Sequence, residues 1–188
     1  MIGMVDYGAG NLFSVANAFR VVGAEYRLVR SGDELAGCSK VVLPGVGHFG
    51  QMFDALESRG FLPALREIDV PLLGICLGMQ ALFESSLEAP GVAGLGLLKG
   101  VVSRLPEGCR VPHMGWNEVV FSDGSRDWFY FANSFVVRQT DAVWGETEYG
   151  VPFSSAVRKG NVTGFQFHPE KSGAAGLELV RRWCEDAG

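Results

Sequence analysis

The chain has 188 residues, of which 47% are hydrophobic and 20% are charged, and its formal net charge is −5 at pH 7. This length fits a single domain over residues 1–188 with a full hydrophobic core. The acidic balance argues against a protein that binds nucleic-acid phosphates, because that binding needs clustered Lys and Arg. No stretch approaches the roughly 20 apolar residues of a membrane-spanning helix, and Asp6 interrupts the first apolar run too early for a signal peptide. We therefore expect a cytoplasmic protein without membrane contacts.

The cysteines are widely spaced and form no C-x-x-C pair. This pattern favours separate reduced thiols over a disulfide framework. No set of His, Cys and carboxylate residues has the spacing of metal ligands, and we expect neither a metal nor a cofactor. The four cysteines are Cys38, Cys76, Cys109 and Cys184.

The first half of the chain alternates short apolar runs with helical patterns. The apolar runs predict strands at residues 2–5, 26–29, 40–43 and 70–75. The helical patterns cover residues 12–19, 49–66 and 77–83. We expect Pro44 to end the third strand, Gly60 and Pro63 to break the second helix, and Ser31 and Glu34 to cap a short helix reciprocally. Strands separated by helices predict βαβ units and a doubly wound, mostly parallel α/β sheet.

The second half of the chain contains strand-like runs separated by turn signals such as Asp123-Gly124. We expect these runs to add antiparallel or mixed strands to the parallel sheet, followed by a last helix at 174–185. The runs cover residues 118–121, 128–131, 135–138, 142–144, 153–158 and 162–167. The buried stripe expected on the last helix consists of Leu177, Val180, Trp183 and Cys184.

Residues 74–80, GICLGMQ, have the G-x-nucleophile-x-G pattern of a nucleophile elbow at a strand-to-helix boundary. Such a turn strains the backbone of the nucleophile, and side chains two residues to either side would collide with neighbouring backbone. Cys76 would begin the helix, where free amides and the helix dipole favour a thiolate. The amide of Leu77 can then serve as an oxyanion-hole donor. The alternative is that Cys76 is a small buried hydrophobic residue at a tight turn.

Among the three histidines, His168 is the strongest candidate for the base that a thiol nucleophile needs. It ends the strand predicted at 162–167, and Pro169 favours an extended conformation for it. Because residues two apart on an extended chain point the same way, Glu170 can reach the imidazole and fix its tautomer. Without the elbow, the same tripeptide would be interpreted as an exposed loop with a surface carboxylate.

The other two histidines are weaker candidates. His113 lies in the polar and aromatic segment PHMGWN at 112–117, which suggests a contact surface. His48 follows the turn LPGVG at 43–47, and we expect it at a helix start. In a parallel sheet this turn opens on the same edge as Cys76. Because it lacks the Lys and Ser/Thr of a phosphate-binding loop, we expect it to supply a second oxyanion donor and part of a substrate pocket.

Together these segments resemble one known family. The elbow and the HPE tripeptide at 168–170 resemble the class I, triad-type glutamine amidotransferases. Further motifs narrow the resemblance to the glutaminase subunits of imidazole glycerol phosphate synthases, and it spans nearly the whole chain. These motifs are DYGAGN at 6–11, LPGVG at 43–47, PHMGWN at 112–117 and HPEKSG at 168–173.

The resemblance implies a flavodoxin-like fold and hydrolysis of glutamine to glutamate and ammonia by a triad of Cys76, His168 and Glu170. It also implies a heterodimer with a (β/α)₈-barrel cyclase subunit. The cyclase would use the ammonia to make imidazole glycerol phosphate and aminoimidazole carboxamide ribotide in histidine biosynthesis. The Gly45–Val46 peptide is expected to reorient when the cyclase is liganded, so that Val46 joins Leu77 as a backbone oxyanion donor.

The resemblance also assigns roles to residues outside the triad. The positions that match the glutamine pocket are Gly47, Gln80, Ser134 and Phe135. The positions that match the partner interface are Asn11, Trp116 and Lys171. Where the family often has His and Tyr, this chain has Asn133 and Phe135, so we expect substrate affinity or coupling to differ.

Three alternatives to this function remain at the level of the sequence. The first is a glutaminase for another pathway, such as anthranilate, pyridoxal phosphate or guanylate synthesis, although residues 112–117 argue against this. A second alternative is a non-catalytic binding or regulatory protein that kept the elbow. A third is a cysteine peptidase or stress-type hydrolase on the same fold, since a fold does not determine a function.

Overall fold

The computed structural model describes residues 1–9 and 11–186. Gly10, which belongs to the DYGAGN motif, lies outside the described residues, as do Ala187 and Gly188. In the described ranges, no helix is both long enough and apolar enough to span a membrane.

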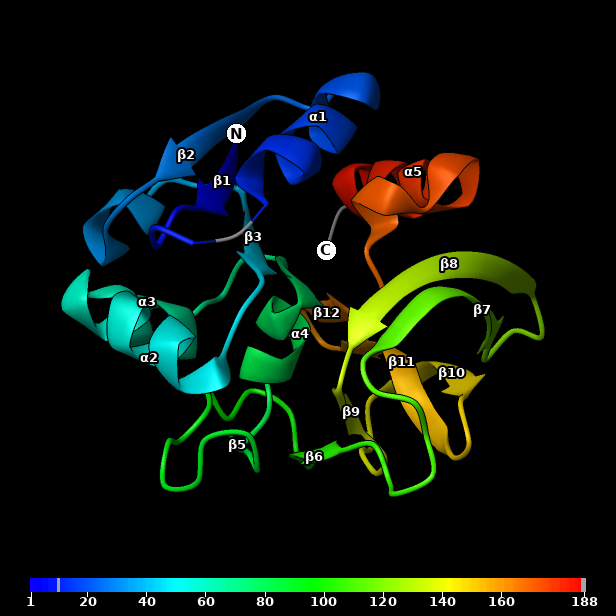
Figure 1. Cartoon of the computed structure of the whole chain (residues 1–188). Helices are drawn as coiled ribbons and strands as arrows, with labels where there is room; N and C mark the ends of the chain where they lie inside the picture. The colour runs from blue at the N-terminus through cyan, green and yellow to red at the C-terminus, as the bar shows by residue number, and fades with distance from the viewer. Residues whose placement is uncertain (10, 187–188) are drawn as a thin grey trace.

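The centre of the molecule is a parallel sheet in the order β2-β1-β3-β4-β12 (Figure 1). This order, with the chain reversing direction across the sheet beside β1, is that of flavodoxin-like folds. It confirms the predicted doubly wound α/β class. The five parallel strands are β1 (Ile2–Val5), β2 (Tyr26–Val29), β3 (Lys40–Gly45), β4 (Leu72–Cys76) and β12 (Val162–Phe165).

Helices cover both faces of the parallel strands, with α1 and α5 on one side and α2 and α3 on the other (Figure 1). Successive strand residues alternate between two cores: Val41 and Leu43 pack toward α2 and α3, and Val42 packs toward α1 and α5. Such near-continuous apolar strands are expected where a parallel sheet is covered twice. The helices are α1 (Leu12–Val21), α2 (Phe49–Ser58), α3 (Phe61–Arg66), α4 (Leu77–Ala81) and α5 (Gly173–Glu185), with 3₁₀ turns η1 (Gly32–Leu35) and η2 (Pro169–Lys171).

The second half adds antiparallel strands to one edge, in the order β11-β10-β7-β8 after β12. Strand β12 follows these antiparallel strands in the chain, but it pairs in parallel with β4 and therefore belongs to the central sheet. The added strands are β7 (His113–Phe121), β8 (Arg126–Asn133), β10 (Val143–Glu148) and β11 (Pro152–Lys159). Shorter strands β5 (Ser85–Ser86), β6 (Val101–Arg104) and β9 (Phe135–Val137) pair beside them.

Two predictions about proline and one about capping are wrong. Strand β3 continues through Pro44, because β1 pairs with it only as far as Val42 and proline is tolerated on an unpaired edge. Pro63 lies in the first turn of α3, where its missing N–H is not needed; Gly60, left-handed at the start of α3, makes the break alone. Ser31 makes no side-chain cap bond.

The role of Glu34 and the buried residues of α5 also differ in part from the prediction. Glu34, expected to cap η1 with Ser31, instead accepts a hydrogen bond from the Arg30 amide at 2.9 Å. On α5, Val180 and Trp183 are buried as predicted, but Leu179 completes the stripe while Leu177 and Cys184 are only half-buried.

The variant Gly78→Ala tests the packing of α4 against β3. A Cβ at this position would overlap the carbonyl of Leu43, and backbone cannot move aside as a flexible side chain does. We expect the free energy of unfolding to fall by about 3 kcal/mol, or folding to fail, measured by urea denaturation. The control is Gly50→Ala in α2, whose Cβ would lie 3.4 Å from that of Ala89 and should be neutral or slightly stabilising. Equal stability of the two variants would contradict the packing argument.

Candidate functional site

The strand β4 ends in the elbow that the sequence predicts. Cys76 has φ 54° and ψ −110° and is the only non-glycine residue with positive φ in the described chain. A backbone conformation of this kind costs about 1–3 kcal/mol. It is held by close packing, because a Cβ on Gly74 would overlap the backbone of α4 and one on Gly78 would overlap β3. The glycines of the motif are therefore required by space, as predicted.

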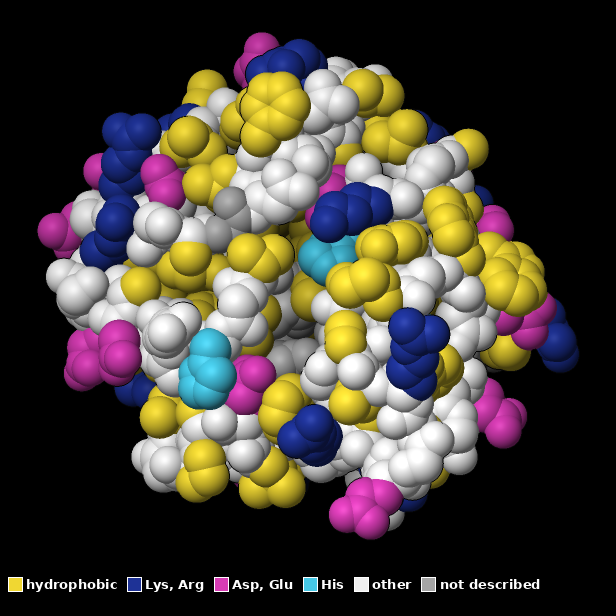
Figure 2. Space-filling view, in the orientation of Figure 1, with side chains coloured by type: hydrophobic (Ala, Val, Ile, Leu, Met, Phe, Trp, Pro, Cys, Tyr) yellow, Lys and Arg dark blue, Asp and Glu magenta, His cyan; other side chains and the backbone are white. Residues whose placement is uncertain are grey.

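Cys76 lies at a cavity of about 290 Å³ at the carboxyl edge of the parallel strands. The molecular face in Figure 2 is hollowed near its centre, and hydrophobic, polar and charged side chains border the hollow. Ligands of doubly wound sheets bind at this edge. The cavity brings together these predicted residues: Cys76 and His168, Val46 and Leu77, the pocket residues Gly47, Gln80, Ser134 and Phe135, and the interface residue Lys171.

Four further residues line the cavity without having been assigned to the pocket from the sequence motifs. Asn133, noted only as a departure from the family pattern, is buried. Its Nδ2 donates to the Phe135 carbonyl at 3.0 Å, and its Oδ1 has no partner in the described residues. Glu88 accepts a hydrogen bond from the Phe49 amide at 2.8 Å, at the start of α2. The remaining two are Pro112 and Ala132.

His168 follows β12 and its imidazole is paired with Glu170. The distance from His168 Nδ1 to Glu170 Oε1 is 2.8 Å, and the two side chains are only 4% and 1% exposed. The reason for this proximity differs from the predicted one. His168 is extended, but Pro169–Lys171 form the 3₁₀ turn η2, and this turn brings the carboxylate back to the ring.

The backbone of His168 is held by hydrogen bonds on both sides. Its amide donates to the Tyr130 carbonyl at 2.8 Å. Its carbonyl accepts from the hydroxyl of Ser172 at 2.6 Å, and this hydroxyl in turn accepts from the Tyr130 amide at 2.9 Å. Strand β8 and the start of α5 thus fix the position of the imidazole.

The charge state of His168 is set by its neighbours. Burial lowers the pKa of the imidazole, but hydrogen bonding and charge attraction from Cys76 and Glu170 outweigh burial and raise the pKa to about 10. The site therefore favours a protonated imidazole between two acidic partners. The imidazole of His168 thus lies between the side chains of Cys76 and Glu170 and is hydrogen-bonded to the Glu170 carboxylate.

Two amide side chains, Gln80 of α4 and Gln166 after β12, form a hydrogen-bonded chain that reaches the sulfur. Gln80 Nε2 donates to the Phe135 carbonyl at 3.1 Å and to Gln166 Oε1 at 3.0 Å. Gln166 Nε2 in turn lies 3.7 Å from Cys76 Sγ. Gln166 was not identified from the sequence, although it lies two residues before His168 and so faces the same way on an extended chain.

Val46 lines the cavity, and Tyr7 is buried close to the backbone of Val46. Val46 is 38% exposed, whereas Tyr7 is 2% exposed. Burial raises the pKa of Tyr7 to about 12, and the backbone amide of Val46 opposes this shift. The amide does not reach hydrogen-bond geometry, and the Tyr7 hydroxyl has no partner within the part of the chain that the structure describes.

The three predicted interface residues lie in different local environments. Asn11 caps α1, where its side chain accepts from the Ser14 amide. Trp116 is 53% exposed on β7 and packs edge-on against Tyr130. Lys171 places its Nζ 5.9 Å from the ring of the same Tyr130.

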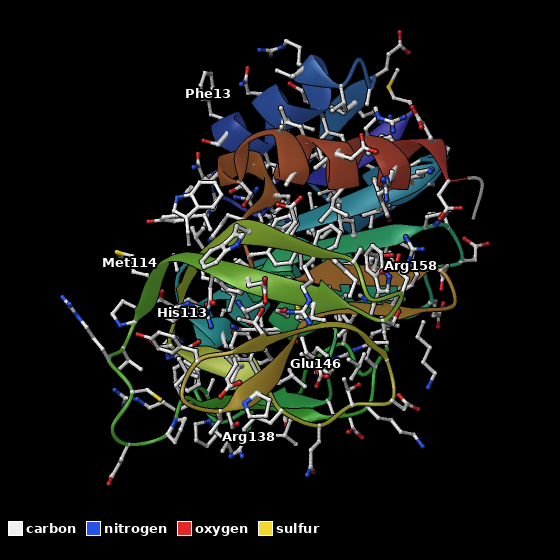
Figure 3. All side chains as sticks on the ribbon, turned by 90° about the vertical axis from the view of Figure 1, so that its right-hand side faces the viewer. Phe13, His113, Met114, Arg138, Glu146 and Arg158 are labelled. Atoms are coloured by element: carbon white, nitrogen blue, oxygen red, sulfur yellow. The ribbon has the colours of Figure 1, made fainter. Side chains whose placement is uncertain are left out.

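Large apolar side chains are exposed near these residues. Phe13 is 79% exposed and Met114 is 65% exposed. In Figure 3 both project on the side that faces the viewer in Figures 1 and 2, which is the side with the hollow. Exposed large apolar side chains on one face are typical of interaction sites when they form a patch.

The two remaining histidines lie outside the cavity lining. His48 begins α2 as predicted, with Nδ1 accepting from the Gly50 amide at 3.1 Å. In the segment 112–117 expected to form a contact surface, Met114 and Trp116 are exposed, but His113 is only 3% exposed, so the expectation is wrong for His113. Strand alternation places it inside, where it stacks between Phe131 and Tyr149 with centroid distances of 4.7 and 3.9 Å.

The family model for glutamine amidotransferase class-I matches residues 3–186. The chain therefore belongs to the class-I glutamine amidotransferase family. A solved glutamine amidotransferase superposes with a TM-score of 0.81 at 22% identity, covering 98% of this chain and 99% of the other. A structure of PurLQS from Thermotoga maritima superposes with a TM-score of 0.74 at 21% identity, with 98% and 96% coverage. At these identities the superpositions establish the fold alone.

Relatives with higher sequence identity assign the chain to one group within this family. The imidazole glycerol phosphate synthase subunit HisH of Moorella thermoacetica is 44% identical over 98% of this chain and 94% of its own length. The HisH subunit of Methanothermobacter thermautotrophicus is 43% identical over 98% of both chains. Within the class-I family, the chain belongs to the HisH glutaminase subunits of imidazole glycerol phosphate synthase.

The burial of His113 predicts a dependence of stability on pH. Burial lowers the pKa of His113 from 6.5 to about 4, so between these values the unfolded chain binds a proton that the folded chain does not. The free energy of unfolding should fall by about 1 kcal/mol per pH unit as the pH drops through this interval. The variant His113→Phe keeps an aromatic ring in the stack and should lose this part of the dependence. Urea denaturation at several pH values measures it, and identical slopes for the two proteins would refute the assignment.

Proposed function

We propose that this chain hydrolyses glutamine with Cys76 as nucleophile, His168 as acid and base, and Glu170 as the residue that orients His168. The observation that supports this best is the buried 2.8 Å pair of His168 and Glu170 at the cavity that contains Cys76. A strained elbow presents the sulfur, and the charge balance favours a protonated imidazole. These are the features required of a thiol nucleophile with its base and orienter.

The reaction proceeds in two steps through a thioester. The thiolate of Cys76 attacks the side-chain amide carbon of glutamine, the C–N bond breaks, and His168 protonates the departing ammonia. Water then gives a proton to His168 and attacks the thioester carbon, so that glutamate leaves and the thiol is restored. Each step passes through an oxyanion that must be stabilised.

The backbone amides of Val46 and Leu77 are the proposed oxyanion donors. Strand pairing places Gly45 opposite Cys76, so the Gly45–Val46 peptide lies beside the elbow. We assign glutamine recognition to Gly47, Gln80, Ser134 and Phe135, which line the cavity. Withholding one oxyanion donor reduces the rate by a factor on the order of 10²–10³. A Val46 peptide that completes the hole only in the liganded complex therefore keeps the isolated chain nearly idle.

The proposed partner is a (β/α)₈-barrel cyclase subunit that forms a heterodimer with this chain. It receives the ammonia and makes imidazole glycerol phosphate and aminoimidazole carboxamide ribotide in histidine biosynthesis. We place the interface at Asn11, Trp116 and Lys171. Exposed Phe13 and Met114 on the side of the hollow support this placement, because a partner there would cover both the apolar surface and the cavity mouth. We further propose that residues 1–188 act as one domain in the cytoplasm.

Ammonia release from glutamine tests the function and its gating. The chain alone should release little ammonia, and addition of the cyclase with its nucleotide ligand should raise the rate by a factor on the order of 10²–10³. Cys76→Ala should abolish release in every mixture. Full activity without the cyclase would discard the gating while keeping the triad, and no activity in any mixture would refute the proposed function.

The variant Trp116→Ala tests the proposed interface. A central tryptophan that is buried by a partner contributes about 2 kcal/mol or more, so we expect the Kd for the cyclase to rise about 30-fold, measured by calorimetry. The control is Leu28→Ala, which removes an exposed apolar side chain from the edge strand β2 and should leave the Kd unchanged. Equal Kd values for the Trp116→Ala and wild-type chains would exclude Trp116 from the interface.

A further inference from the structure

Gln166 is a buried polar side chain in contact with the proposed nucleophile. It is fully buried, at 0% exposure, and follows strand β12. Its Nε2 lies 3.7 Å from Cys76 Sγ, within the range of a hydrogen bond to sulfur. Its backbone amide donates to the Ser155 carbonyl at 2.9 Å, which holds the residue against β11. The side chain therefore reaches the sulfur from a fixed position on the central sheet.

The orientation of the Gln166 amide follows from the groups that surround it. The Phe135 carbonyl can only accept, so the group of Gln80 that faces it must be the NH₂ donor. The same Gln80 nitrogen also faces Gln166, which must therefore present its oxygen. The NH₂ group of Gln166 is then directed at the sulfur. A backbone carbonyl thus determines, through two amides, that a donor and not an acceptor meets Cys76.

We propose that Gln166 is a catalytic residue that donates a hydrogen bond to the thiolate of Cys76; this inference rests on the proposed function. Hydrogen bonding to the anionic form of a group favours that form. An amide carries no proton that it can transfer, so it stabilises the sulfur without competing with His168 for acid–base work. The bond serves the thiolate twice, first as attacking group and later as leaving group when the thioester is hydrolysed.

The competing explanation is that Gln166 only supports Gln80 and the wall of the cavity. Gln166 Oε1 accepts from Gln80, which lines the cavity, so loss of Gln166 could disturb the pocket without any effect on the sulfur. The two explanations differ in one respect. A hydrogen bond to the thiolate changes the pH at which Cys76 becomes reactive, whereas a supporting role does not.

The variant Gln166→Met separates these explanations, because it removes the NH₂ that faces the sulfur without placing a new charge beside the sulfur. We would measure the rate of Cys76 alkylation by iodoacetamide against pH in the full chain, by mass spectrometry. The midpoint of the profile should move up by about one pH unit, and the rate below the midpoint should fall about tenfold. Glutamine hydrolysis in the liganded cyclase complex should fall by about the same factor.

A control variant in β12 and a second Gln166 variant accompany this experiment. Thr163→Val changes another buried polar residue of β12 that has no contact with the sulfur, and its alkylation profile should match the wild type. If Gln166→Met does not fold, Gln166→Leu also removes the donor without adding charge and should shift the profile in the same direction. An unmoved profile in a folded Gln166 variant would overturn the proposal. A wild-type complex that releases no ammonia would overturn the proposed function instead, because alkylation measures the hydrogen bond without glutamine.

Discussion

The strained backbone of Cys76 is the constraint on which the site depends. A non-glycine residue at φ 54° stays there only when its surroundings leave no alternative. Here α4 packs so closely on β4 and β3 that Gly74 has no room for a side chain beside α4, and Gly78 has none beside β3. The same close approach pairs Gly45 with Cys76 and brings the glycine-rich turn beside the sulfur. The close packing that holds this strained residue thus also fixes the relative positions of the proposed nucleophile and the proposed oxyanion donors.

The second requirement is that a strand from the end of the chain returns to the centre of the sheet. Strand β12 pairs in parallel with β4 and in antiparallel with β11, so it joins the two halves of the molecule. Parallel strands end at the same edge, and His168 therefore emerges next to Cys76 despite a separation of more than ninety residues in sequence. The antiparallel strands hold this return strand in place, since Tyr130 on β8 bonds to the backbone of His168.

Features set by local patterns were predictable from the sequence, and features set by distant pairing were not. The elbow at Cys76 follows from glycine spacing, and the central strands follow from apolar runs that a covered parallel sheet requires. The parallel pairing of 162–165 depends on β4, which no local pattern reveals. The contact of Glu170 with His168 was predicted for an extended chain, but a 3₁₀ turn produces it. Gln166 lies between two phenylalanines, and only its contact with the sulfur distinguishes it from a core residue.

Unpaired polar atoms gather around the cavity, and their cost bears on how the site works. Glu170 Oε2, Asn133 Oδ1 and the Tyr7 hydroxyl are buried without partners in the described residues, and each such group costs about 1–3 kcal/mol. Two of these residues touch or support the cavity lining, and Tyr7 lies beside the Val46 amide. Burial elsewhere in the core is mostly apolar, although His113 Nδ1 and Ser154 Oγ are also buried without partners in the described residues. The unpaired groups beside Cys76 can bind a ligand without first breaking a bond within the protein, which is what a preorganised site requires.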